Sequence, residues 1–228
     1  MRMRKKPNLI PRMERCEAVL IREPEENRGR WLEAVPGFGR LFLELGCGKG
    51  RFTAETARTI PDTLLVAVER VPDAMVVGME RVVAGGIGNV RFLDRDAQNL
   101  PAIFAPGEVD RIFINFCDPW PGKRHAKRRL TSEGFLRIYQ GILKPGGEIW
   151  FKTDNSPLFE YSLEQFEALG FTLSEVTRDL HADGIRGVMT DYEAKFHAQG
   201  VPINRCVARY EKTGDAHPEK AGETDWES

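Results

Sequence analysis

Residues 115–130, NFCDPWPGKRHAKRRL, place an acid and an aromatic ring directly before a cluster of cations. Asp118 offers a hydrogen-bond acceptor, and Trp120 offers a flat face on which a nucleobase can stack. Together they can aim one nitrogen of a stacked base at an electrophilic carbon. The cations that follow are Lys123, Arg124, Lys127, Arg128 and Arg129. This cluster favours a polyanionic substrate, although a run of charge is more often solvated surface.

A glycine-rich turn, ELGCGKG, occupies residues 44–50. Glycine permits a sharp turn and a close approach of the backbone to a ligand. The spacing does not fit a dinucleotide fingerprint, because Arg51 holds the position of the third glycine. It does not fit a Walker loop either, because no Ser or Thr follows the GK. The turn resembles motif I of class I S-adenosylmethionine-dependent methyltransferases, in which the loop containing Gly46 wraps the amino-acid part of the cofactor.

Acidic residues stand at the ends of three consecutive predicted strands. They are Glu44, Glu69 and Asp96. A carboxylate at the edge of a sheet is costly unless a ligand supplies donors, so three in succession favour a bound cofactor. Glu69 is placed to accept both ribose hydroxyls, and Asp96 is placed at the adenine edge. Taken with the resemblance to motif I, these positions imply S-adenosyl-L-methionine as the cofactor.

Short apolar runs alternate with amphipathic segments from about residue 40. The apolar runs predict strands at residues 40–45, 63–69, 89–94, 109–116 and 147–153, with closing strands at 171–180 and 203–212. The intervening segments predict helices at residues 51–59, 72–85, 96–104, 131–143 and 156–169. Strict alternation predicts a Rossmann-like α/β fold, with a mostly parallel central sheet and helices on both faces. Ligands of such a sheet bind beyond the carboxyl ends of the strands, where the motifs above fall.

Composition limits the classes of protein that remain. The 228 residues hold 33 Lys and Arg against 34 Asp and Glu, so any RNA-binding surface is local rather than global. Four separated cysteines and four scattered histidines predict neither a metal site nor a disulfide framework. We expect a cytoplasmic protein, because no apolar run approaches the length of a signal or membrane-spanning segment.

Charge also divides the chain. We expect a basic N-terminal arm and leading helix in residues 1–35, one methyltransferase domain in residues 36–212, and a disordered acidic tail in residues 213–228. The arm is either a second RNA contact or a solubilising leader.

Several blocks in order resemble the bacterial tRNA (guanine-N7)-methyltransferase family. They are DPWP with KRHAKRRL, then KTDN at residues 152–155, and TDYEAKF at residues 190–196 followed by GVPI. The resemblance runs from about residue 9 to residue 211, and it implies a class I methyltransferase. It implies methyl transfer from S-adenosyl-L-methionine to N7 of a guanine at position 46 of tRNA, in the variable loop. The implied partner is tRNA, bound by a monomer or homodimer without metal.

The resemblance also implies roles for individual residues. Cofactor contacts fall at Glu44, Gly46, Glu69, Asp96 and Asp118, and Asp118 is also the proposed catalytic residue. RNA-binding residues are Arg124, Lys127, Arg128 and Arg129, and substrate-binding residues are Lys123, Asp154, Thr190, Asp191, Tyr192 and Glu193. The family commonly has a lysine directly after DPWP, whereas this chain has Gly122 and then Lys123, so the role of Lys123 stays open.

Two of these assignments have a structural alternative. Residues 190–193, TDYE, have the form of a capping box at the start of a helix that ends near Ala198. Asp154 is likewise placed to cap a helix that begins near Ser156.

The mechanism expected for such an enzyme is mostly positioning. Guanine N7 already has an in-plane lone pair, so no proton has to leave it before attack. Asp118, with Asp154, would stabilise the positive charge that the purine gains. Three other classes compete: a methyltransferase for exocyclic amines, whose motif resembles DPPY; a noncatalytic RNA-binding protein on a methyltransferase scaffold; and a dehydrogenase, which Arg51 disfavours.

Overall fold

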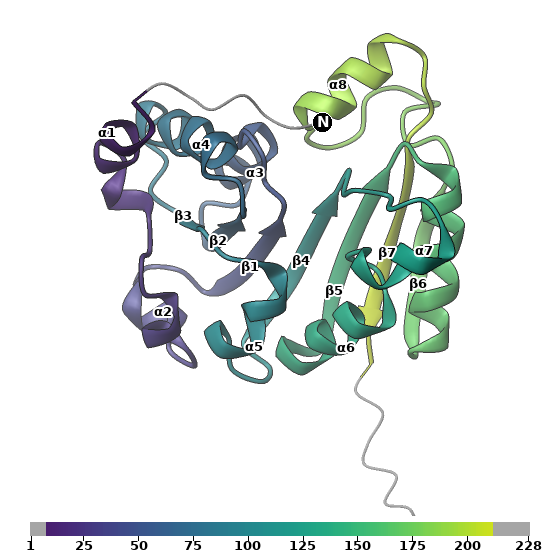
Figure 1. Cartoon of the computed structure of the whole chain (residues 1–228), viewed down its shortest axis with the longest axis horizontal. Coiled ribbons are helices and arrows are strands. Elements are labelled where there is room, and N and C mark those ends of the chain that lie inside the picture. The colour runs from purple at the N-terminus through teal and green to yellow at the C-terminus, as the bar shows by residue number, and fades with distance from the viewer. Residues whose placement is uncertain (1–7, 212–228) are drawn as a thin grey trace, which may run out of the picture.

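A seven-stranded sheet forms the centre of the protein, in the order β3-β2-β1-β4-β5-β7-β6 (Figure 1). The computed structural model describes residues 8–211. The strands are β1 (Arg40–Leu45), β2 (Thr63–Val68), β3 (Val90–Leu93), β4 (Val109–Asn115), β5 (Leu143–Thr153), β6 (Phe171–Thr177) and β7 (Asn204–Tyr210). Neighbours from β3 to β5 pair in parallel, and β7 pairs antiparallel with both β5 and β6. The predicted mostly parallel α/β sheet is confirmed.

Helices cover both faces of the sheet. One face packs against α1 (Leu9–Glu14), α3 (Arg51–Thr59) and α4 (Pro72–Ala84). The other packs against α2 (Trp31–Ala34), α5 (Leu100–Ile103), α6 (Glu133–Ile142) and α7 (Ser156–Ala168). Helix α8 (Asp191–Ala198) lies at the carboxyl end of the parallel strands (Figure 1). The described residues also form four short 3₁₀ segments: η1 (Glu17–Val19), η2 (Pro24–Asn27), η3 (Ala97–Asn99) and η4 (Lys123–Arg128).

Side-chain alternation along the strands divides the core into two clusters. In β1, Leu41, Leu43 and Leu45 pack with α2, α5 and α6, whereas Phe42 packs with α3. Residues two apart on a strand share a face, so β1 contributes to both clusters. The next residue on the Phe42 face is Glu44, which places a carboxylate beneath the first turn of α3.

The third glycine of the turn at residues 44–50 is required by helix packing. Gly50 has a φ of 67°, and a Cβ there would lie 2.6 Å from the Cα of Gly78 in α4. Real Cβ atoms do not approach so closely, so glycine at this position lets α3 begin directly against α4. Gly46, with a φ of 76°, has open space where a Cβ would project. The two glycines therefore serve different purposes.

Some predicted boundaries are wrong. The predicted helix at residues 96–104 is the short η3 followed by one turn of α5, because Pro101 fits only the first turn of a helix. The predicted fifth strand begins four residues earlier, at Leu143, which pairs with Val109 before a register shift. The predicted closing strand at residues 171–180 ends at Thr177.

The described part of the predicted N-terminal segment packs onto the sheet. Leu20 bridges to Phe92 of β3, and the backbone amide of Ile21 donates to the Phe92 carbonyl at 3.1 Å. Residues 1–7 of the predicted basic arm and the predicted tail at residues 213–228 lie outside the described residues. Within residues 8–211, no helix combines the length and apolar character needed to cross a membrane.

Candidate active site at the carboxyl end of the sheet

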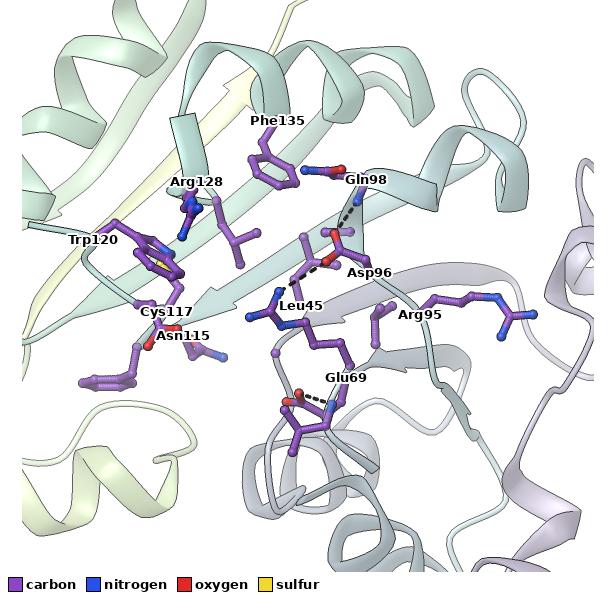
Figure 2. Close-up of a pocket in the computed structure, with 18 of the residues that line it drawn as sticks. Leu45, Glu69, Arg95, Asp96, Gln98, Asn115, Cys117, Trp120, Arg128 and Phe135 are labelled. Atoms are coloured by element: carbon purple, nitrogen blue, oxygen red, sulfur yellow. Dashed lines mark hydrogen bonds and ion pairs between the residues drawn. The ribbon is translucent and has the colours of Figure 1, made fainter. Parts of the chain in front are cut away.

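A cavity of about 470 Å³ opens beyond the carboxyl ends of β1, β2 and β4 (Figure 2). We call it the strand-end cavity. Its walls are the segments that follow four strands, together with η4. Residues that line it include Gly46, Glu69, Asp96, Asn115, Asp118, Trp120, Lys127 and Arg128, with Leu130 and Phe135 as apolar surface. The position agrees with the rule that ligands of an open α/β sheet bind at this edge.

Glu69 joins the glycine turn to the end of β2. One of its oxygens accepts from the backbone amide of Gly48 at 3.0 Å, and the other accepts from that of Val71 at 2.9 Å. A carboxylate oxygen has two acceptor sites, so each oxygen retains one for a further donor. The geometry is compatible with two hydroxyl groups binding at Glu69.

Asp96 lies on the same side of the strand-end cavity as Glu69, facing Trp120 and Arg128 (Figure 2). Its side chain caps η3 by accepting from the backbone amide of Gln98 at 3.0 Å, and it lies 3.5 Å from the guanidinium of Arg70. Both interactions fix the carboxylate at the cavity wall.

Glu44 does not reach the cavity surface. Its side chain is 2% exposed, and the Thr53 hydroxyl of α3 donates to it at 2.5 Å. Burial raises the pKa of Glu44 to about 7, against the opposing effects of Thr53 and Lys152. Among the described residues, Glu44 is therefore placed behind the cavity wall, and its predicted cofactor contact stays a prediction.

The loop that contains Asp118 is held in a strained conformation. Phe116 and Trp120 have φ angles of 52° and 42°, in the left-handed region that is costly for residues other than glycine. Asp118 lies exposed between them. Arg129 braces this loop, because its guanidinium donates to the carbonyls of Pro119 at 3.1 Å and Trp120 at 3.2 Å. Strain of this kind clusters at functional sites.

The basic cluster forms the 3₁₀ segment η4. Of the predicted RNA-binding residues, Lys127 and Arg128 line the strand-end cavity, and the Arg128 guanidinium lies 4.9 Å from the Trp120 ring centroid. Lys123 and Arg124 are exposed and outside the cavity lining. Arg129 packs over the Tyr161 ring at 4.3 Å while it braces the loop.

Comparison with known proteins decides the family. A family model described as "Putative methyltransferase" matches residues 39–206. A tRNA (guanine-N(7)-)-methyltransferase of Geobacillus kaustophilus (strain HTA426) is 44% identical over 209 residues, which cover 91% of this chain and 96% of the relative. The chain belongs to the tRNA (guanine-N7)-methyltransferase family.

A second relative agrees with this family, and a solved structure agrees with the fold. The tRNA (guanine-N(7)-)-methyltransferase of Bacillus cytotoxicus is 40% identical over 211 residues, covering 92% of this chain and 97% of the relative. A solved 16S rRNA (adenine(1408)-N(1))-methyltransferase with cosubstrate SAM, from Catenulisporales acidiphilia, has a TM-score of 0.58 and 18% identity. That alignment covers 85% of this chain and 94% of the other, and it shows the methyltransferase fold alone.

In this member of the tRNA (guanine-N7)-methyltransferase family, the predicted capping box at residues 190–193 is confirmed. The Thr190 hydroxyl accepts from the Glu193 amide at 2.9 Å, and the Glu193 carboxylate accepts from the Thr190 amide at 3.1 Å. The Glu193 side chain is completely buried. It accepts from Lys152 Nζ at 2.6 Å and contacts His181 Nε2 at 3.0 Å. Glu193 therefore anchors α8 to β5 within the protein.

The other predicted substrate-binding residues lie at the surface around this anchor. Asp191 and Tyr192 are exposed, and Asp191 lies 3.9 Å from the guanidiniums of Arg51 and Arg81. Asp154 is half-buried after β5, and its predicted capping role is wrong. Asn155 caps α7 instead, because its side chain accepts from the Leu158 amide at 2.8 Å.

Sequence reasoning missed three buried polar residues of the methyltransferase. Asn115 lines the strand-end cavity, and its Nδ2 has no hydrogen-bond partner within residues 8–211. Asn115 could have been predicted from the sequence, because it is the last residue of β4 and polar residues at strand ends are candidates for ligand binding. Lys152 and His181 gave no comparable signal, since their shared partner Glu193 is distant in sequence.

No group of three or more His, Cys, Asp and Glu side chains is arranged to hold a metal ion within residues 8–211.

Proposed function

We propose that this chain transfers the methyl group of S-adenosyl-L-methionine to N7 of a guanine in the variable loop of tRNA, at the strand-end cavity. One observation carries the proposal. The cavity brings the strand-end acids Glu69 and Asp96 together with Asp118, Trp120 and a cationic rim. The names of the relatives from Geobacillus kaustophilus and Bacillus cytotoxicus support the substrate and the atom that is methylated. A tRNA substrate also favours a cytoplasmic location.

The residues of the cavity fit the cofactor. Glu69 has a free acceptor site on each oxygen for the two ribose hydroxyls. Asp96 supplies an acceptor at the adenine edge, and Phe135 supplies apolar surface beside it. The unpartnered amide of Asn115 is a donor without an acceptor, which the carboxylate of an amino-acid group would supply. When bound, the cofactor supplies a methyl group on a positively charged sulfur.

Asp118 contacts the hydrogen-bonding edge of the guanine and not its N7 atom. The N7 lone pair forms the new bond to the methyl carbon while the carbon–sulfur bond breaks, so no proton leaves N7. The purine gains positive charge, and the fixed carboxylate of Asp118 stabilises it and accepts a hydrogen from the base edge. Trp120, next to the strained turn, stacks the base. The strained loop holds both groups before substrate binds.

The cationic side chains divide into two roles. Lys127 and Arg128 lie at the rim of the cavity and bind phosphates beside the target nucleotide, while the exposed Lys123 and Arg124 extend this surface. Arg129 positions the Asp118 loop through its two carbonyl contacts. Thr190, the N-cap of α8, and Asp191 and Tyr192 in its first turn remain proposed substrate contacts, and Glu193 positions the helix.

Methylation of unmodified tRNA with radiolabelled cofactor tests the proposal. We expect label on one guanine of the variable loop, mapped by reduction and aniline cleavage, which breaks the chain at N7-methylguanosine. A tRNA with adenine at that position is the matched control and takes up no label there. Label that resists aniline cleavage would indicate an exocyclic amine product instead. Cofactor binding without any transfer would indicate an RNA-binding protein on this scaffold.

A further inference from the structure

A second cavity, of about 410 Å³, lies between α3, the sheet and residues 180–188. We call it the lateral cavity. Its floor is the face of β1, β4 and β5 that carries Phe42, Phe113 and Trp150, and α3 adds Phe52. Asn115 lines both cavities, because it shares a face of β4 with Phe113 and also ends the strand. The lateral cavity is thus adjacent to the candidate active site and separate from it.

Two guanidinium groups cover the indole ring in this cavity. Arg111 lies 4.0 Å from the Trp150 ring centroid, and Arg205 lies 4.7 Å from it. Carboxylates hold both groups in place: Glu148 accepts from Arg111 at 2.8 Å, and Glu175 accepts from Arg205. A guanidinium fixed in this way is itself a flat cationic surface on which a base stacks.

The charge of the lining is mainly positive. Four cationic side chains line the lateral cavity, and one carboxylate does. They are Arg111, Lys152, Arg186 and Arg205, with Glu175 as the acid. Lys152 also pairs with Glu193, and Arg186 lies 3.2 Å from Asp183. Each of the four cations is therefore already paired with a carboxylate, and an anionic group of a ligand would bind through the remaining N–H donors of the guanidinium groups.

Polar atoms in the lining lack hydrogen-bond partners. Within residues 8–211, Arg111 Nε and the Thr56 hydroxyl are buried without a partner. Thr56 is only 6% exposed, so bulk water does not satisfy its hydroxyl. Buried polar groups in proteins are almost always paired, so unpaired groups around one cavity indicate a ligand with acceptor atoms.

We propose that the lateral cavity binds one nucleotide, with the base against the aromatic floor and guanidiniums and the phosphate facing the cationic mouth. A nucleobase combines a flat apolar face with in-plane acceptors, which Arg111 Nε and the Thr56 hydroxyl would engage. The volume lies in the range of small-ligand pockets. The nucleotide comes either from the bound tRNA, which rests on the proposed function, or from a free mononucleotide.

Calorimetric titration with GMP and with AMP tests the site directly. The full-length protein is first saturated with S-adenosylhomocysteine, which fills the cofactor part of the strand-end cavity. The lateral-cavity variants then separate binding in the lateral cavity from binding at the base subsite beside Asp118 and Trp120. We expect saturable binding of at least one mononucleotide to the wild type. Arg111→Met should weaken it about tenfold or more, because a charge-assisted hydrogen bond and a stacking surface are lost. Thr56→Val, which keeps the shape of the side chain, should weaken it severalfold.

The matched control is Arg137→Met, which removes an exposed guanidinium paired with Glu133 on α6. We expect it to bind the mononucleotide as the wild type does. All variants should bind S-adenosylhomocysteine equally, which confirms that they are folded. No saturable binding to the wild type, or equal binding by the wild type, Arg111→Met and Thr56→Val, would overturn a mononucleotide site.

Photo-crosslinking distinguishes the two sources. tRNA containing 4-thiouridine is irradiated with the protein, and the crosslinked peptides are mapped. Crosslinks to the peptide containing Trp150 that GMP or AMP suppresses identify a tRNA nucleotide as the occupant. Mononucleotide binding without such crosslinks identifies a free mononucleotide. Absence of both results refutes the proposal. None of these readouts uses methyl transfer, so failure here is distinguishable from failure of the proposed function.

Discussion

Lys152 Nζ lies 2.6 Å from the Glu193 carboxylate, and this pair joins strand β5 to helix α8. Their side chains are 9% and 0% exposed, so the pair is shielded from water. Glu193 is the buried residue of α8. A buried charge pair therefore anchors the helix that presents the proposed substrate contacts, and Phe196 adds an apolar contact by stacking on Phe116, with ring centroids 6.1 Å apart.

We expect Lys152→Met to destabilise the protein by about 3–5 kcal/mol, because it leaves the Glu193 carboxylate buried without its cation. Chemical denaturation measures this. Lys195→Met, an exposed lysine on the same helix, is the control and should change stability by less than about 0.5 kcal/mol. The double variant Lys152→Met, Glu193→Leu should recover most of the loss. A single Lys152→Met variant as stable as the wild type would contradict the anchor.

We expect Asp118→Ala to lower the single-turnover rate of methylation by about 10²–10³-fold, because the developing charge on the purine loses its fixed carboxylate. The affinity for S-adenosylhomocysteine, measured by calorimetry, should change much less. Asp118→Asn keeps an acceptor without the charge, so its single-turnover rate should fall between those of the wild type and Asp118→Ala. An unaltered single-turnover rate in Asp118→Ala would remove the residue from the mechanism.

Cations at the cavity rim and the cation that braces the loop should behave differently. Replacing Lys127 and Arg128 together by Ala should weaken tRNA binding and lower the slope of its salt dependence by roughly 1 to 2, because fewer counterions are released. Arg129→Ala should leave this slope unchanged and lower the methylation rate, because the Asp118 loop loses its brace. Filter binding across a salt series, with single-turnover rates, separates the two. Equal slopes in all three proteins would argue against phosphate contacts at the rim.

The two glycines of the turn should differ in their effect on folding. Gly50→Ala introduces a Cβ 2.6 Å from the Gly78 Cα in addition to an unfavourable φ, whereas Gly46→Ala meets open space and bears only the backbone strain. We expect Gly46→Ala to cost about 1–2 kcal/mol and Gly50→Ala about 1–3 kcal/mol more. Thermal unfolding compares them. If Gly46→Ala were the more damaging change, close packing of α3 on α4 would not be the reason for Gly50.

Burial raises the pKa of Glu44 to about 7 from an unfolded value near 4.5, so the folded state binds this proton more tightly. The contribution of Glu44 to the free energy of unfolding is therefore fully present below about pH 4.5. It is lost as the pH rises toward 7, and the total loss is roughly 3 kcal/mol. Glu44→Gln should lack this loss, as urea unfolding at pH 5 and pH 8 would show. A parallel pH dependence in the two proteins would show that Glu44 does not titrate in this way.

The same carboxylate offers a test of its predicted cofactor contact. A cationic amino group beside Glu44 would favour the ionised form, so affinity for S-adenosylhomocysteine should rise as the pH passes 7 in the wild type. Glu44→Gln should show no such rise. Identical affinity profiles would place the cofactor out of reach of Glu44.

Local patterns were sufficient to predict much of the fold. The predicted limits of β1 and α3 agree with the structure, because alternation of apolar residues and the change to helical spacing are both local signals. The early start of β5 was missed because KPGG at residues 144–147 has the composition of a turn. Pro101 fits only the first turn of α5, so the predicted third helix is too long.

The site was only partly predictable for a related reason. Strand-end position identified Glu69 and Asp96 from the sequence, and the structure places both at the cavity wall. Burial is not a local property, so neither the depth of Glu44 nor the anchoring of Glu193 was visible. The partners of Glu193 come from β5 and from the segment before α8, and only the folded chain brings them together.

The antiparallel strand β7 lies between β5 and the edge strand β6, so residues 204–210 supply the strand that pairs with the outer side of β5. During synthesis, β5 must emerge from the ribosome and wait while about fifty further residues are made, with its outer backbone groups unpaired. We therefore expect nascent chains halted before β7 to aggregate or to recruit chaperones. Once β7 has emerged from the ribosome, it can pair with the outer side of β5, and the unpaired backbone groups of β5 are then satisfied.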